Sequence, residues 1–150
     1  MTRAKLLKGH LGPVLFQLPP HWRVNTERLD SFTDILPRGP KYVFEFREKS
    51  WYCEEVYKIL SKKKMSLCLH DMRTSASPEI LVGPLCYMRF HGSTSLYGGK
   101  YPINTLRRYA RFIKKALKEG KEVYAYFNND ARANAPQDAL RLMRELKRQK

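Results

Sequence analysis

The sequence predicts an α/β fold of parallel strand–helix units, the architecture of a TIM-type barrel. Segments rich in β-branched and aromatic residues alternate with segments of helical periodicity along most of the chain. The predicted strands have an apolar face, as expected where helices cover a sheet, and on most of them the other face becomes polar toward the C-terminal end. Strands joined by crossover helices run parallel, so these features together predict the fold class.

Five strands are predicted because each segment is bounded by glycine, proline or charged turns. They are Pro13–Leu18, Lys41–Arg47, Met65–Asp71, Leu85–Gly92 and Glu122–Asp130. The connection Met72–Pro84 has no helical periodicity, and we expect a loop there.

Four helices are predicted from capping residues and apolar spacing. Asn25 and Ser50 are expected to cap the first two, Pro102 opens the third, which Gly120 ends, and the fourth begins near Pro136. The residues expected to be buried are Leu29, Phe32, Ile35 and Leu36; Trp51, Val56, Ile59 and Leu60; Leu106, Tyr109, Ala110, Ile113 and Leu117; and Ala139, Leu140, Met143 and Leu146.

The 150 residues, 43% of them hydrophobic, suit one globular domain. No apolar run is long enough to cross a bilayer, and the N-terminus lacks a signal-peptide pattern, so we expect a cytoplasmic protein without a membrane partner. Cys53, Cys68 and Cys86 are odd in number and unpaired in spacing, which favours three buried free thiols over disulfides or a zinc knuckle.

The formal net charge of +15 is the unusual bulk property. The basic residues fall on polar helix faces and in C-terminal turns, which is typical of a solvated outer shell. A basic face is also the first requirement of a nucleic-acid-binding protein, so nucleic acid stays open as a partner.

Polar side chains are predicted to gather where the parallel strands end, which is the edge at which α/β folds bind ligands. These residues are Gln17, Glu45, Arg47, Arg89, His91, Asn128 and Asp130, with either His70 or Asp71 facing inward on the third strand. Glycines follow Arg89 and His91 at Gly92 and at 98–99, and arginine, histidine and free backbone amides suit an anion.

Two alternatives to a ligand site remain open. Glu45 would pair with Arg47 or Arg89 in a satisfied network, with Asn128 or Asp130 tying down loops, because a buried charge needs a partner. A metal site would use His70, Asp71, His91, Glu45 or Asp130, but no HxH or HExxH spacing supports one. The sequence also lacks a GxSxG elbow and the known phosphate-binding glycine motifs.

Several blocks of sequence carry a resemblance to a known family. They are GPVLFQLPP (12–20), EFR (45–47) with Ser50-Trp51, RFHG (89–92), Tyr97 with Tyr101, and YFNND (126–130). Their order, from about Leu11 to Leu142, resembles the YecE-like family, domain of unknown function family 72. The resemblance implies a TIM-like barrel of unsettled activity whose polar mouth would be lined, by analogy, by Gln17, Glu45, Arg47, Asp71, Arg89, His91, Asn128 and Asp130.

The resemblance also implies an incomplete barrel. Family members carry further strand–helix units before GPVLFQLPP, whereas only about ten residues precede it here, so residues 1–150 resemble the last five of eight units. A complete barrel needs about 250 residues. We therefore expect a missing N-terminal barrel piece supplied elsewhere, a truncated non-catalytic remnant, or self-association through open strand edges.

Two functions of different classes follow as hypotheses. In the first, an enzyme acts on a small anionic substrate by acid/base chemistry, with Glu45 or Asp130 as general acid or base and His91 as proton shuttle. Its substrate-binding residues would be Gln17, Arg47, Asp71, Arg89, Gly92, Tyr97, Tyr126 and Asn128. In the second, nucleic acid stacks on Trp51, Tyr97, Tyr101 and Tyr126. The sequence identifies no cofactor.

Overall fold

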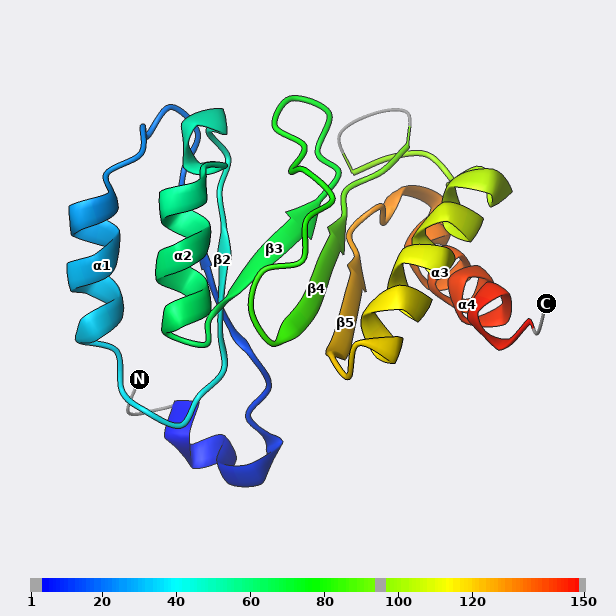
Figure 1. Cartoon of the computed structure of the whole chain (residues 1–150). Coiled ribbons are helices and arrows are strands. Elements are labelled where there is room, and N and C mark those ends of the chain that lie inside the picture. Colours follow the sequence, from blue (N-terminus) through cyan, green and yellow to red (C-terminus); the bar gives the residue numbers. More distant parts are fainter. Residues whose placement is uncertain (1–3, 94–96, 149–150) are drawn as a thin grey trace.

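The computed structural model shows a curled half-barrel of five parallel strands in the order β1-β2-β3-β4-β5 (Figure 1). The structure describes residues 4–93 and 97–148. The strands are β1 (Val14–Gln17), β2 (Tyr42–Glu45), β3 (Ser66–His70), β4 (Leu85–Phe90) and β5 (Glu122–Phe127). The helices are α1 (Thr26–Asp34), α2 (Glu54–Lys62), α3 (Ile103–Lys118) and α4 (Asn134–Lys147), with short 3-10 helices η1 (Ala4–His10), η2 (Lys49–Trp51) and η3 (Ala131–Ala133).

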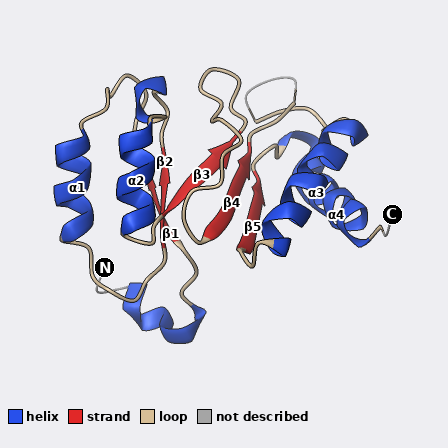
Figure 2. Cartoon of the chain, viewed as in Figure 1, coloured by secondary structure: helices blue, strands red, loops and turns tan. Residues whose placement is uncertain are grey.

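The predicted fold class is confirmed. Every predicted strand is present, every neighbouring pair is parallel, and the connection between β3 and β4 contains no helix in the described residues (Figure 2). Asn25 caps α1 as predicted, because its Oδ1 accepts the N–H of Arg28 at 2.8 Å. The carboxyl ends of all five strands therefore lie at one edge of the sheet.

The outer face of the sheet is apolar and is covered by helices in two clusters. Phe44 of β2 and Phe46 just after it pack with α1, α2 and η2, and Trp51 stacks on Phe46 with ring centroids 4.7 Å apart. Met88 and Phe90 of β4 pack under α3 and α4. Burial of such large side chains stabilises the fold by about 2–3 kcal/mol each.

The inner face of the half-barrel changes character along the strands. Near the strand beginnings it is an apolar floor of Val43, Cys68, Leu85 and Tyr87, with Leu15 and Tyr124 packed against it. One step further along, β1 and β2 align Gln17 with Glu45, and β3 and β4 align His70 with Arg89. The polar layer therefore lies above an apolar floor, at the C-terminal edge.

Two contacts show how strongly the sheet curls. Lys41, just before β2, forms an ion pair with Glu122 at the start of β5. At the other end, Nη1 of Arg89 on β4 donates to Oε1 of Gln17 on β1 at 3.1 Å. Both contacts reach across intervening strands on the inner side, so side chains from β1 to β5 converge there.

The predicted cap of α2 is wrong. Cys53 is the N-cap residue, and Ser50 lies in η2, where its Oγ accepts the N–H of Val24 at 2.9 Å. Glu48 caps η2 instead by accepting the N–H of Ser50. This extra turn allows the indole of Trp51 to stack on Phe46. That packing explains why α2 begins after Cys53 and not directly after Ser50.

Four residues that were predicted to be buried are exposed: Ile35 (76%), Leu117 (52%), Leu140 (55%) and Met143 (52%). In α4 the cause is Asp138, which is fully buried and accepts hydrogen bonds from the backbone N–H of Tyr101 and from Asn129. A helix that points residue 138 inward must turn its neighbours at 140 and 143 outward.

All three cysteines are free; Cys68 and Cys86 are buried as predicted, whereas Cys53 is only half-buried. Among the described residues, none of the helices has the length and apolarity needed to cross a bilayer.

Candidate functional site

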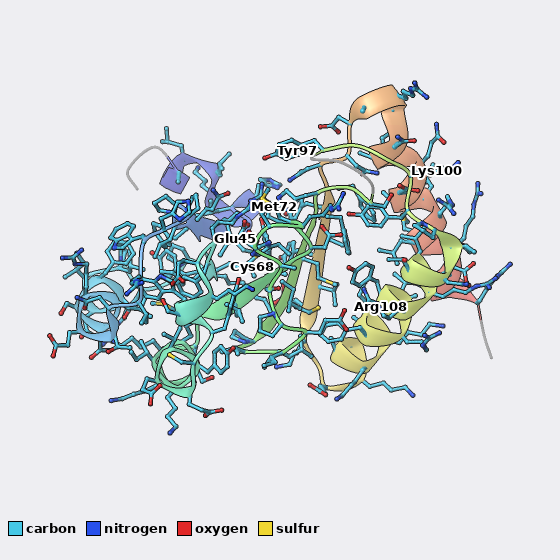
Figure 3. The ribbon with its side chains drawn as sticks, turned by 90° about the horizontal axis from the view of Figure 1, so that it is seen from above. Glu45, Cys68, Met72, Tyr97, Lys100 and Arg108 are labelled. Atoms are coloured by element: carbon cyan, nitrogen blue, oxygen red, sulfur yellow. The ribbon has the colours of Figure 1, made fainter. Side chains whose placement is uncertain are left out.

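A cavity of about 1100 Å³ opens at the C-terminal edge of the half-barrel. Its walls come from the ends of β1 and β2 and from the loops after β3 and β4. The lining residues are Gln17, Pro20, His21, Arg47, Glu48, Lys49, Met72, Arg73, Thr74, Ser75, His91, Gly92 and Tyr97. Figure 3 looks onto this edge and shows Glu45, Met72 and Tyr97 in one region, with Arg108 away from it on α3. The cavity therefore lies where the strand-end polarity predicted a site.

Glu45 is the charged centre beneath the cavity. Its side chain is fully buried, its Oε1 contacts Nη2 of Arg47, and its Oε2 accepts Nη1 of Arg89 at 2.7 Å. Burial alone would raise the pKa of Glu45, but the Arg89 hydrogen bond and the charges of Arg47 and Arg89 outweigh burial and hold it below its ordinary value. Glu45 is therefore a carboxylate that holds two arginines in place.

Arg47 joins this ion cluster to His91. Its Nη2 lies 3.2 Å from Nε2 of His91 and 3.4 Å from Oε1 of Gln17. Because a guanidinium has only donors, Nε2 of His91 must accept in this contact. In that tautomer the ring proton is on Nδ1, which faces Oδ1 of Asp71 at 3.8 Å.

Asp71 and Tyr101 fix the backbone that carries His91. Oδ1 of Asp71 accepts the N–H of His91 at 2.7 Å, and Oδ2 accepts the hydroxyl of Tyr101 at 2.5 Å. The same hydroxyl accepts the N–H of Gly92 at 2.8 Å. Burial raises the pKa of Tyr101 far above its usual range, with the bond to Asp71 adding to the effect, so its hydroxyl stays protonated and can donate.

His70 is the inward residue of β3, which settles the alternative left open by the sequence. Its Nε2 lies 3.0 Å from the carbonyl oxygen of Phe46 and 3.1 Å from the hydroxyl of Tyr52. Burial lowers the pKa of His70, although the nearby Glu45 opposes this shift, so the ring is neutral and donates from Nε2. His70 therefore links β3 to the end of β2.

Three residues that line the cavity keep a buried polar atom without a hydrogen-bond partner in the described structure. These atoms are Nε of Arg47, Oγ of Ser75 and Nδ1 of His91, in side chains that are 8%, 7% and 2% exposed. Such an atom costs roughly 1–3 kcal/mol unless something satisfies it. Each of the three can donate, so a ligand rich in acceptors would satisfy them.

The structure brings most of the predicted site residues together, but not all of them. Those at the cavity or its ion cluster are Gln17, Glu45, Arg47, Asp71, Arg89, His91, Gly92 and Tyr97. Asp130 is exposed at the start of η3 and does not line the cavity. Asn128 uses its backbone N–H to bond the carbonyl of Phe90 at 2.7 Å, and Tyr126 packs on Tyr87 within the inner face.

Sequence reasoning missed the loop after β3 and the support from α4. Met72, Arg73, Thr74 and Ser75 line the cavity although the segment has no periodicity or motif. Asp138 could have been noticed as an acidic residue within a predicted helix, but a carboxylate at such a position is usually solvated.

Two of the four aromatic residues proposed for base stacking are buried, so that part of the nucleic-acid hypothesis is wrong. Trp51 is 2% exposed under Phe46, and Tyr101 is 3% exposed among hydrogen bonds. Tyr97 and Tyr126 are 46% and 44% exposed, and Tyr97 lies beside His91 with ring centroids 5.8 Å apart. Only Tyr97 of these four lines the cavity.

Within residues 4–93 and 97–148, no three histidine, cysteine or acidic side chains are placed so that they could hold a metal ion. The charged side chains that line the cavity are mostly basic instead: Arg47, Lys49 and Arg73 against Glu48. The arrangement suits an anion better than a cation.

Comparison with known proteins identifies a family and a fold. The family model described as "Protein of unknown function DUF72" matches residues 1–150. No protein among those with curated descriptions matches the sequence. The solved structure of the DUF72 family protein TM1631 from Thermotoga maritima is similar, with a TM-score of 0.84, 23% identity, and coverage of 97% of this chain and 62% of that one.

A second solved protein of this family gives the same result. Two structures of EF0366 from Enterococcus faecalis have TM-scores of 0.84 and 0.82 at 19% and 21% identity, and each covers 99% of this chain. They are covered over 64% and 66% of their own length. The chain thus spans somewhat less than two thirds of the length of the solved structures that it resembles.

Proposed function

We propose that this protein, which belongs to the DUF72 family, binds a small anionic molecule in the cavity at the C-terminal edge of its half-barrel. The observation that carries the proposal is the set of three buried donors without partners on Arg47, Ser75 and His91. A buried donor without a partner is uncommon and costly, and an oxyanion offers the acceptors that these groups lack.

The charges around the cavity support the same ligand class. Lys49 and Arg73 add cations at the rim, and Arg47 is anchored from below by the buried carboxylate of Glu45. An arginine held in this way loses little side-chain entropy on binding, which favours affinity. A phosphate or carboxylate group would take its two-pronged guanidinium contact.

We further propose that His91 transfers protons for a bound substrate. His91 lines the cavity, and its ring is oriented by Arg47 on one side and Asp71 on the other. A bound substrate that takes the place of the 3.2 Å contact between Arg47 and Nε2 of His91 could give its proton to Nε2, and the neighbouring carboxylate of Asp71 would stabilise the imidazolium.

The geometry favours His91 over the carboxylates that the sequence offered as acid or base. Glu45 has no exposed surface and a lowered pKa, so we assign it the role of positioning Arg47 and Arg89. Asp130 is exposed outside the cavity. Acid/base chemistry is therefore proposed for His91 with Asp71 as its partner.

Binding is tested by isothermal titration calorimetry at low salt with glucose 6-phosphate, citrate and inorganic phosphate, and with glucose as the neutral comparison. We expect the anions to bind and the Lys49→Gln/Arg73→Gln variant to bind them about tenfold more weakly. Lys58→Gln/Lys62→Gln on α2 removes the same charge away from the cavity and should bind like the parent protein. Equal loss in both variants, or no anion binding, would contradict the proposal.

The proton-transfer role is tested separately. For any bound anion that the protein converts, His91→Gln, which keeps an N–H donor for the anion but cannot transfer a proton, should keep the affinity within a few-fold while turnover falls by about 100-fold or more. Unchanged turnover would remove His91 from the chemistry and leave the binding proposal in place.

A further inference from the structure

The basic residues of the chain are unevenly distributed over the fold. Helix α3 contains six lysines and arginines and no acidic residue, whereas α1 contains three acidic residues and one arginine. A net charge of +15 alone would allow a uniformly basic surface. The concentration of positive charge on α3 therefore points to a role for that particular surface.

The basic residues of α3 form one continuous surface. With about 100° per residue, positions 107, 111, 115 and 118 fall on one side of the helix, while 106, 110 and 113 fall on the buried side. This agrees with burial, because Leu106 and Ile113 are almost fully buried and Arg111 and Lys118 are exposed. The solvent-facing side of α3 between residues 107 and 118 is therefore mostly cationic, with Leu117 as an exposed apolar residue.

Helix α4 extends this surface, since it lies beside α3 (Figure 1). Arg107 donates to Glu145 of α4 at 3.2 Å, and Nζ of Lys114 donates to the carbonyl oxygen of Arg148 at 2.7 Å. We define the α3–α4 basic face as Arg107, Arg111, Lys115, Lys118, Arg144 and Arg148. Glu145 is the acidic residue within it, and its carboxylate is nearly buried between Arg107 and Arg148.

We propose that the α3–α4 basic face binds the phosphate backbone of a nucleic-acid duplex. Residues 107 to 118 extend over about 17 Å of helix, and a duplex presents roughly one negative charge per 1.7 Å of its axis. A row of arginines and lysines over that length can meet several phosphates at once. This face lies on the outer helices, apart from the cavity at the strand ends, as the position of Arg108 on α3 illustrates in Figure 3.

The aromatic residues of α3 favour a duplex over a single strand. Tyr109 is buried with Arg108 over its ring at 4.9 Å, and Phe112 is half-buried against the core, so single-stranded bases find little exposed aromatic surface there on which to stack. Leu117 of α3 and Leu140 and Met143 of α4 are exposed, so an anionic membrane surface is the competing partner, and the vesicle measurement below distinguishes it from the duplex.

The proposal is tested by fluorescence anisotropy with a labelled 20-base-pair duplex as salt is raised from 50 to 200 mM. If the face neutralises about five phosphates, a plot of the logarithm of the binding constant against the logarithm of the salt concentration should have a slope of about −4 to −5. The variant Arg111→Gln/Lys115→Gln/Lys118→Gln should bind at least tenfold more weakly, and the magnitude of its slope should be smaller by about 2–3. The matched variant Lys58→Gln/Lys62→Gln/Lys64→Gln removes three charges elsewhere and should bind within about twofold of the parent protein.

Several outcomes would overturn the proposal. Equal losses in the two triple variants would show that overall charge, and not this face, attracts the duplex. Tighter binding of a single strand of the same length, or binding to phosphatidylserine vesicles without duplex binding, would assign a different partner. The absence of any duplex binding at 50 mM salt would end the proposal.

Discussion

Nη1 of Arg89 lies 2.7 Å from Oε2 of Glu45 and joins β4 to β2 across β3 inside the half-barrel. The thiol of Cys68 on the intervening strand donates to the same oxygen at 3.5 Å. Burial raises the pKa of Cys68 well above its ordinary value, and the nearby Glu45 carboxylate adds to this, so the thiol keeps its proton. Three strands thus share one buried carboxylate beneath the cavity.

Replacement Glu45→Gln should destabilise the protein by about 3 kcal/mol, because Arg47 and Arg89 would face each other without the charge that compensates them. For a domain of this size that loss lowers Tm by roughly 10 °C. Differential scanning calorimetry measures it.

Glu122→Gln provides the control, since it removes a carboxylate whose ion pair with Lys41 is exposed to solvent and screened by it. Its Tm should stay close to that of the parent protein. A Glu45→Gln protein that melts at the parental temperature would show that the buried ion cluster does not hold the sheet together.

His70 should make stability depend on pH. Burial lowers its pKa in the folded state below the ordinary value of 6.5 that applies to the unfolded chain. Between these two values the unfolded chain binds more protons, so the free energy of unfolding falls as pH drops from about 6.5 through the folded pKa. Urea unfolding at intervals from pH 7.5 to 5 measures this slope.

His70→Gln keeps an N–H donor for the carbonyl of Phe46 but cannot titrate, so its slope over this range should be smaller. His10→Gln, in exposed η1, should keep the parental slope. Parallel curves for the His70→Gln variant and the parent protein would assign the pH dependence to other groups.

Gly83, in the loop before β4, should not tolerate a side chain. It has a φ of +79°, and a Cβ there would lie 2.0 Å from the carbonyl oxygen of Met65. Gly120, after α3, has a similar φ of +74° with open space around it. Gly120→Ala should therefore cost about 1 kcal/mol and Gly83→Ala about 3 kcal/mol or more, as measured by chemical denaturation. Equal losses of stability in the two variants would mean that the positive φ, and not the close approach to Met65, determines the cost of a side chain at Gly83.

The fold was accessible from the sequence because local patterns agree with the global arrangement. Strands such as that around Phe44 and Phe46 alternate between apolar and polar faces, and Asn25 and Gly120 mark the ends of helices that do form there. The placement of the candidate site was predictable to the same extent, since the parallel register brings strand-end residues such as Glu45 and His91 to one edge.

The remainder depends on contacts between distant segments. Asp138 turns α4 so that Leu140 faces solvent, and its partners Tyr101 and Asn129 cannot be inferred from helical spacing. Ser75 reaches the cavity on a loop without periodicity. The strand pattern also placed Asp130 at the site. The chain instead turns into η3 at that residue, which leaves its carboxylate outside the cavity.

Tyr101→Phe tests whether the support behind His91 matters for binding. The hydroxyl donates to Asp71 and accepts the N–H of Gly92, so its removal leaves both groups without a partner that they have in the parent protein. We expect a loss of about 1–2 kcal/mol in the free energy of unfolding. We also expect weaker anion binding, because the backbone of His91 and Gly92 forms part of the cavity wall.

A matched variant distinguishes the loss of stability from the loss of anion binding. Tyr124→Phe removes a hydroxyl that bonds exposed Glu122 and should change neither property appreciably. If Tyr101→Phe loses stability but binds the anion as before, Tyr101 only supports the fold, and Asp71 orients His91 without it. If affinity falls at a temperature where both variants are fully folded, the hydroxyl positions the site, because denaturation cannot then account for the loss.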